Sequence, residues 1–333
     1  MEKQERTPFL ATTPGVVLGC LICCALWGSA FPCIKIGYAL FGVDAADTAS
    51  QLLLAGVRFT AAGIMVIIGT SLARRTPLLP SRTDIGPILI LAAFQTVGQY
   101  IFFYMGLSRA SGTTSSIIES SANFMAILFA ASIFRTERLT SRKIVGCLIG
   151  FAGVVLINLG GAGTARGISF TLDGEGFVLV SCVSAALSTC LIGIFSHDHD
   201  GVLLSGWQFL VGGIVLTIGG SLLGGHLAPQ SPAHAFTLLA YMAFISAMAY
   251  SMWARLLAVN PVSRVSVFGF MNPVFGVILS ALLLGEGRNA NPLVLLTALA
   301  LVCAGIIVVN RPGAVQEKAG SPAELHPKTW MVK

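Results

Sequence analysis

The sequence predicts an all-α membrane protein in which ten transmembrane helices form two inverted five-helix repeats. Three observations lead to this fold class. The chain carries too little charge for a soluble protein, its apolar residues fall into blocks of membrane-spanning length, and its second half repeats the pattern of its first. The connections between the blocks are short, so they leave little room for a soluble domain.

The composition excludes a soluble globular protein. Charged residues make up 10% of the 333 residues and hydrophobic residues 55%, whereas soluble domains carry about 25% charged residues. Lipid must therefore cover much of the surface. The net charge is +6, but the basic residues lie between apolar blocks and form no stripe with interleaved aromatic residues. This arrangement argues against a nucleic-acid partner and for a lipid bilayer.

Ten apolar blocks are each about 20 residues long, the length that crosses a ~30 Å hydrocarbon layer at ~1.5 Å per residue. They predict membrane-spanning helices at 15–38, 50–73, 84–107, 112–134, 141–160, 175–195, 202–224, 235–257, 262–285 and 291–311. We expect four regions: a cytoplasmic N-terminal segment (1–14), a first repeat (15–160), a second repeat (175–311) and a disordered cytoplasmic tail (312–333).

The distribution of Lys and Arg predicts the orientation of the chain. Fourteen of these residues lie in the segments on the side of the N-terminus, against three in the loops on the other side. Because cytoplasmic segments carry the excess of positive charge, both termini are expected in the cytoplasm, with the protein in the cell membrane.

The sequence predicts no metal site and no cofactor. Cys20 and Cys23 form a CxxC motif, but it falls within a helix and has no second cysteine pair. The run His197–Asp200 is interpreted as a polar turn, because no further ligand lies nearby.

A comparison of the chain with itself identifies the repeat. At an offset of 150, residues 53–72 align with residues 203–222, so that Phe59 meets Phe209 and Arg58 meets Gln208. At an offset of 149, Asn123 meets Asn272 and Glu137 meets Glu286. Each half has five helices, an odd number, so the second copy enters the membrane from the opposite side. Such inverted repeats can exchange between two similar packings that open to opposite sides.

At these positions the sequence resembles the drug/metabolite transporter superfamily, specifically the EamA-type ten-helix permeases. The resemblance covers about residues 15–311 and implies a substrate cavity between helices one to four and six to nine. It also implies transport without ATP hydrolysis. Two features depart from the family pattern: Phe124 stands where proline is frequent, and the sixth helix has Ala186-Leu187-Ser188 without a tryptophan. The residues that carry the resemblance are Trp27-Gly28-Ser29, Phe31, Lys35, Arg58-Phe59, Ser111-Gly112, Phe134, Glu137, Asn272-Pro273 and Leu284-Gly285-Glu286.

Three ionisable residues lie well within the predicted spans: Lys35, Arg58 and Glu119. A charge in hydrocarbon costs ~3 kcal/mol or more, so each needs a reason. In one interpretation Glu119 pairs with Arg58 or Lys35 and has a structural role. In the other, two cations exceed one anion, and Arg58 grips a carboxylate or phosphate of the substrate. A further hypothesis makes Glu119 a proton-coupling acid, which requires that it be unpaired.

Polar and aromatic neighbours complete the candidate binding site. Gln95 and Gln99 share a helix face, and Asn123 lies one turn from Glu119. These side chains could bind a solute or join helices together. Tyr104 and Trp207 could stack against a ligand.

The pair Asn272-Pro273 lies within the ninth span, where proline bends a helix. We consider it either a gating hinge or a static kink. The pair Gly146 and Gly150 has the spacing that lets helices approach closely. We expect this packing within the monomer, with a homodimer contact as the alternative.

These features predict a secondary transporter that works by alternating access and moves a small polar or amphipathic metabolite. An amino acid is the leading candidate, and export is the preferred direction. The alternatives are a multidrug or toxic-compound exporter of the same fold and a membrane-embedded enzyme. The enzyme is disfavoured because the chain has no HExxH, no GxSxG and no paired carboxylates at a useful spacing.

Overall fold

The computed structural model describes residues 8–44, 46–107, 109, 112–159, 171–284 and 292–311, and within these ranges the chain is helical with no strand. The predicted tail and Glu286 lie outside them. In chain order the helices are η1 (Phe9–Ala11), α1 (Thr13–Phe41), α2 (Thr48–Arg74), α3 (Arg82–Leu91), η2 (Ala92–Gly98), α4 (Gln99–Leu107), α5 (Gly112–Ser132), α6 (Ser141–Leu159), α7 (Glu175–Asp198), α8 (Gly201–Leu222), α9 (Pro232–Val259), α10 (Val262–Ser266), η3 (Val267–Phe270), α11 (Met271–Leu284) and α12 (Pro292–Asn310).

These helices confirm the predicted ten-span fold. Within the described part of the chain, nine helices are long and apolar enough to cross a membrane, and a shorter apolar helix, Ile117–Ser132, occupies the fourth predicted span. Two spans are not uniform. The third consists of α3, the π-helical turn η2 and α4, and the ninth consists of α10, the 3₁₀ stretch η3 and α11.

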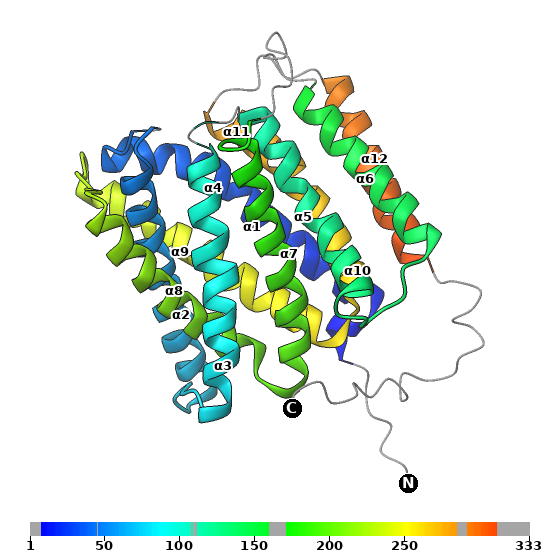
Figure 1. The fold of residues 1–333 in the computed structure, drawn as a ribbon, viewed down its shortest axis with the longest axis horizontal. Helices are drawn as coiled ribbons and strands as arrows, with labels where there is room; N and C mark the ends of the chain where they lie inside the picture. Colours follow the sequence, from blue (N-terminus) through cyan, green and yellow to red (C-terminus); the bar gives the residue numbers. More distant parts are fainter. Residues whose placement is uncertain are drawn as a thin grey trace.

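The second helices of the two halves, α2 and α8, pack against each other as an antiparallel pair at one edge of the molecule (Figure 1). A Cβ added at Gly63 would lie 2.5 Å from the Leu210 nitrogen, and one at Gly213 would lie 2.4 Å from the Thr60 nitrogen. Thr60 and Leu210 are counterparts in the repeat, as are the two glycines. The two contacts are therefore related by the internal symmetry, and glycine is needed at both because the backbones touch.

The fifth helices, α6 and α12, pair in the same way at the opposite edge (Figure 1). A Cβ at Gly146 would lie 2.8 Å from the Gly305 oxygen, and one at Gly150 would lie 2.8 Å from Cδ2 of Phe270. Both glycines of the predicted small-residue pair thus contact other helices of the same chain.

The first helix of each half packs within the other half. Helix α1 contacts α9 and α11, whereas α7 contacts α4 and α5. Gly28 permits the close approach of α1, since a Cβ there would lie 2.4 Å from Cβ of Phe275 in α11. Because the first helix of each half packs in the other half, the two repeats form one bundle. The pair α2–α8 lies at one edge of this bundle.

The predicted polar turn between α7 and α8 is tied to the first half by ion pairs. Asp200 pairs with Arg74 at the end of α2. Nδ1 of His199 lies 2.6 Å from a carboxylate oxygen of Asp84 in α3. Partial burial would raise the pKa of Asp200, but hydrogen bonds from Arg74 and from the N–H groups of Val202 and Leu203 outweigh it, so the pKa lies below its usual value.

Candidate functional site

Arg58 is a buried cation near the middle of the membrane-spanning bundle. It lies ten residues into α2, a depth of ~15 Å at ~1.5 Å per residue, and is 4% exposed. Its Nε and Nη2 donate hydrogen bonds to Oγ of Ser246 in α9, at 3.3 and 3.0 Å. Its guanidinium lies 4.7 Å from the ring centre of Phe59. Among the described residues, no carboxylate lies within 4 Å of it.

Glu119 carries the opposite charge, seven residues into α5, and is half-buried. It forms no ion pair with Arg58, so the predicted structural pairing of these two residues is not observed in the described part of the chain. Arg58 and Glu119 therefore do not neutralise each other in the described part of the chain.

A continuous row of aromatic rings runs through the interior beside Arg58. Phe59 and its repeat counterpart Phe209 stack at 5.2 Å with an interplanar angle of 15°. Phe59 also lies 4.6 Å from Tyr100, and Phe209 lies 4.9 Å from Tyr250. The row continues at its two ends to Tyr104, Trp27 and Trp253. Both halves of the chain therefore supply rings to this row.

A buried hydrogen-bond chain joins the third span to α8. Thr96 Oγ1 donates to Oε1 of Gln208 at 2.6 Å, and Nε2 of Gln208 donates to Oε1 of Gln95 at 3.1 Å. Thr96 and Gln95 lie in the π-helical turn η2, where the wider turn frees backbone carbonyls. The Phe94 carbonyl accepts a hydrogen bond from Oγ of Ser184 in α7 at 2.7 Å. The amide oxygen of Gln95 thus accepts a hydrogen bond that joins the third span to α8.

The other predicted residues lie at varying distances from this centre. Gln99 is half-buried, and Lys35 is exposed in α1. Asn123 packs against η3, since a Cβ at Gly269 would lie 2.0 Å from its Oδ1. Trp207 donates its indole N–H to the Leu78 carbonyl at 2.8 Å. It therefore holds the α2–α3 connection and does not belong to the aromatic row.

The predicted hinge at Asn272-Pro273 begins α11, directly after η3. Pro273 cannot donate a backbone hydrogen bond to the residue four positions earlier, Gly269, which lies in that 3₁₀ stretch. Oδ1 of Asn272 is buried and has no hydrogen-bond partner within the described part of the chain. The structure therefore has an irregular backbone at the predicted place, and its movement stays a prediction.

The sequence matches the EamA-like transporter family over residues 14–159 and again over residues 172–311. The chain belongs to this family. Among similar family members, the transporter YvbV of Bacillus subtilis (strain 168) is 26% identical over 300 residues, which cover 88% of this chain and 91% of YvbV. The inner membrane transporter YedA of Escherichia coli (strain K12) is 27% identical over 265 residues, covering 78% of this chain and 80% of YedA.

A transporter of Archaeoglobus fulgidus is also similar, with 27% identity over 295 residues that cover 86% of this chain and 95% of the relative. The same fold occurs in a crystal structure that is 20% identical, with a TM-score of 0.72, and the match covers 90% of this chain and 97% of the other. We conclude that this EamA-like protein is a multi-pass membrane transporter.

Sequence reasoning missed several residues of the centre of this EamA-like protein. Ser246, which accepts both hydrogen bonds from Arg58, is far from it in sequence. Gln208, which the repeat aligns with Arg58, is fully buried and central to a hydrogen-bond chain. The sequence did indicate two members of the aromatic row, because the repeat aligns Phe59 with Phe209.

Proposed function

We propose that the protein is a secondary transporter of the cell membrane that exports a small amphipathic metabolite carrying a carboxylate, with an amino acid as the leading candidate. The two inverted repeats alternate between a packing open to the cytoplasm and a packing open to the outside. Arg58 binds the carboxylate, and the aromatic row contacts the apolar part of the substrate.

The observation that carries this proposal is the isolation of Arg58 from any carboxylate of the described residues. Ser246 satisfies part of its hydrogen-bonding capacity, and the Phe59 ring lies against its guanidinium. Neither neutralises its charge. Because a buried charge without a counter-ion is costly, binding an anionic group there would be favourable. A guanidinium can grip a carboxylate with two parallel hydrogen bonds.

A second candidate function is multidrug export, and the aromatic row favours it. A flat organic cation could stack on these rings and be attracted to Glu119. Such a substrate would gain nothing from Arg58. The two candidates therefore differ in whether transport depends on the charge at position 58.

The experiment measures uptake into proteoliposomes that contain the purified protein, with a panel of labelled amino acids and cationic dyes. The Arg58→Gln variant is expected to reduce transport of the carboxylate substrate about a hundredfold, since a charged hydrogen-bonded contact is worth ~3 kcal/mol. Arg58→Lys keeps the charge but loses the two-pronged geometry, so it should retain an intermediate rate.

Arg255→Gln is the matched control, because Arg255 is an exposed arginine in α9. It should transport normally. Wild-type rates in Arg58→Gln would exclude Arg58 as the carboxylate site. Transport of dyes but not of amino acids, independent of position 58, would favour the multidrug function.

A further inference from the structure

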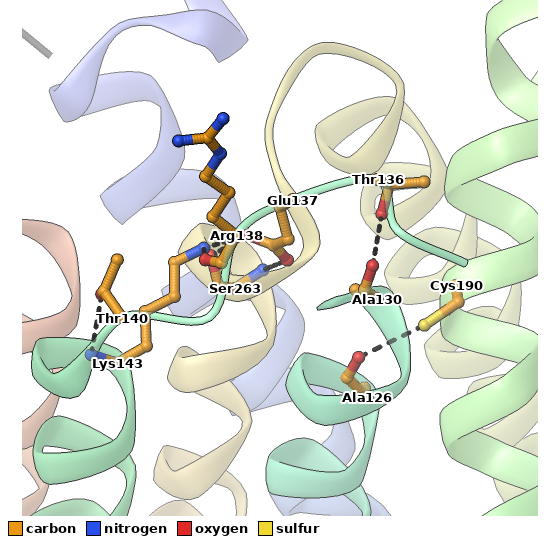
Figure 2. Close-up of polar contacts among 9 residues, drawn as sticks. All are labelled: Ala126, Ala130, Thr136, Glu137, Arg138, Thr140, Lys143, Cys190 and Ser263. Carbon is orange, nitrogen blue, oxygen red and sulfur yellow. Dashed lines mark hydrogen bonds and ion pairs between the residues drawn. The ribbon is translucent and has the colours of Figure 1, made fainter. Parts of the chain in front are cut away.

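Glu137 connects the two halves of the molecule. It lies in the connection between α5 and α6, and its carboxylate reaches α10 in the second half. Oε1 accepts a hydrogen bond from the backbone nitrogen of Ser263 at 2.9 Å, and Oε2 accepts one from the Ser263 hydroxyl. Lys143, at the start of α6, donates to the same Oε2 and to the Arg138 carbonyl. Figure 2 shows Glu137 and Ser263 directed toward each other, with Lys143 beside them.

This group, here called the Glu137 contact (Glu137, Lys143 and Ser263), is well enclosed. The side chains of Glu137 and Lys143 are 8% and 17% exposed. An ion pair with this little exposure is screened much less than a surface pair. Removing its carboxylate would leave donors from both halves without their acceptor, so the contact favours the present packing of the halves.

The Glu137 contact lies at the end of the bundle where α1 begins and α12 ends. Arg264, next to Ser263, donates a hydrogen bond to the Ala11 carbonyl at 3.1 Å, which places α10 beside the start of α1. The Arg74–Asp200 ion pair and the Asp84–His199 contact join the two halves at the same end. At the opposite end, the described ion pair is Arg109–Asp173, and both of its side chains are more than half exposed.

We infer that the Glu137 contact is a latch that closes the end of the transporter where α1 begins, and that it releases each time this end opens. The contact is made between a connection of the first half and a short helix of the second, so any packing that separates the halves at this end must break it. Its polar character suits repeated breakage, because the freed carboxylate, ammonium and hydroxyl groups can be hydrated at the membrane surface.

The test follows the opening of this end with a cysteine. Ser266 lies one helical turn beyond Ser263, is 1% exposed, and its hydroxyl has no hydrogen-bond partner among the residues that the structure describes. Ser266→Cys therefore introduces a buried thiol without removing a hydrogen bond. The protein is placed in lipid nanodiscs and treated with a water-soluble maleimide. Mass spectrometry of the peptide that contains position 266 gives its labelling rate. No substrate is required, so the result is independent of the proposed substrate.

In the Ser266→Cys background, Glu137→Gln is expected to raise the labelling rate about tenfold, because the charge-assisted hydrogen bonds are lost and the open state becomes more populated. Ser263→Ala removes the hydroxyl but keeps the backbone donor, so it should give a smaller increase. If Glu137→Gln does not fold, the labelling rate of the Ser263→Ala variant tests the latch by itself.

The matched control is Glu175→Gln. Glu175 is buried, accepts hydrogen bonds from the backbone and hydroxyl of Thr171 within its own half, and lies at the opposite end of the bundle. It should leave the labelling of position 266 unchanged. An unchanged rate in folded Glu137→Gln or in Ser263→Ala, or an equal increase in Glu175→Gln, would overturn the latch.

Discussion

Arg58 and Glu119 carry opposite charges in the same half of the chain, but they do not pair among the described residues. Arg58 is 4% exposed and Glu119 is half-buried, so water solvates neither charge fully. A substrate group can satisfy the arginine, and a proton can satisfy the carboxylate.

The role of Glu119 in coupling can be tested directly. Glu119 forms no ion pair among the described residues, as the proposed proton-coupling role requires. Glu119→Gln keeps the size of the side chain and removes its titration. We expect this variant to lose the dependence of transport on an imposed pH gradient while it still exchanges substrate between the two sides. Proteoliposome uptake with and without a gradient measures both. A pH response equal to that of the wild type would remove Glu119 from the coupling mechanism.

The sequence identified the charged residues of the centre but not their partners. Arg58 and Glu119 stand out because ionisable residues are rare within apolar blocks, whereas Lys35, singled out for the same reason, is exposed. Ser246 does not stand out, since serine is common in membrane helices and its contact with Arg58 depends on how α2 meets α9. Trp207 was a candidate to stack against a ligand, and the sequence did not indicate that its N–H donates to the Leu78 carbonyl between α2 and α3. Contacts between distant segments require the packing, which a single sequence does not supply.

At the scale of elements, the sequence predicted the ten spans to within a few residues but did not predict their irregularities. The π-helical turn η2 has no proline or glycine at its start, and its backbone is stabilised by Ser184 of another helix. The 3₁₀ stretch η3 was not predicted either, but it ends at Phe270, shortly before the pair Asn272-Pro273 at which the sequence predicts a hinge or a kink. The sequence therefore marked the neighbourhood of the second irregularity, whereas the first depends on a contact between helices.

The glycines between α2 and α8 give a prediction about this pair. Gly63→Ala would place a Cβ 2.5 Å from the Leu210 nitrogen and 2.7 Å from the Gly206 oxygen, both backbone atoms that cannot rotate away. We expect a loss of stability of about 1–3 kcal/mol from this overpacking. Thermal unfolding of the purified protein measures it. Gly69→Ala in the same helix is the control, since nothing lies within 4 Å of its added Cβ. Equal melting temperatures for the two variants would show that the helices can move apart without cost.

For the whole molecule, the internal repeat is the strongest feature of the sequence, and the structure gives it a physical meaning. The pairs α2–α8 and α6–α12 join like helices of the two halves, and α1 and α7 cross into the opposite halves. The two halves share one arrangement of helices but not the same charged residues, because Arg58 corresponds to Gln208 and Glu119 to Phe268. The charged groups of the candidate site come from the first half, and the aromatic rings come from both.

The orientation of the whole molecule is the last prediction. Ten spans place both ends of the chain on one side of the membrane, and the bias of fourteen basic residues against three assigns that side to the cytoplasm. A fluorescent protein fused to the C-terminus should therefore fluoresce. Alkaline phosphatase, which is active only outside the cytoplasm, should be active when fused after Gly225, between α8 and α9, and inactive when fused after Arg75, between α2 and α3. The reverse pattern would place the Glu137 contact at the outer face, where its release would open the transporter to the outside.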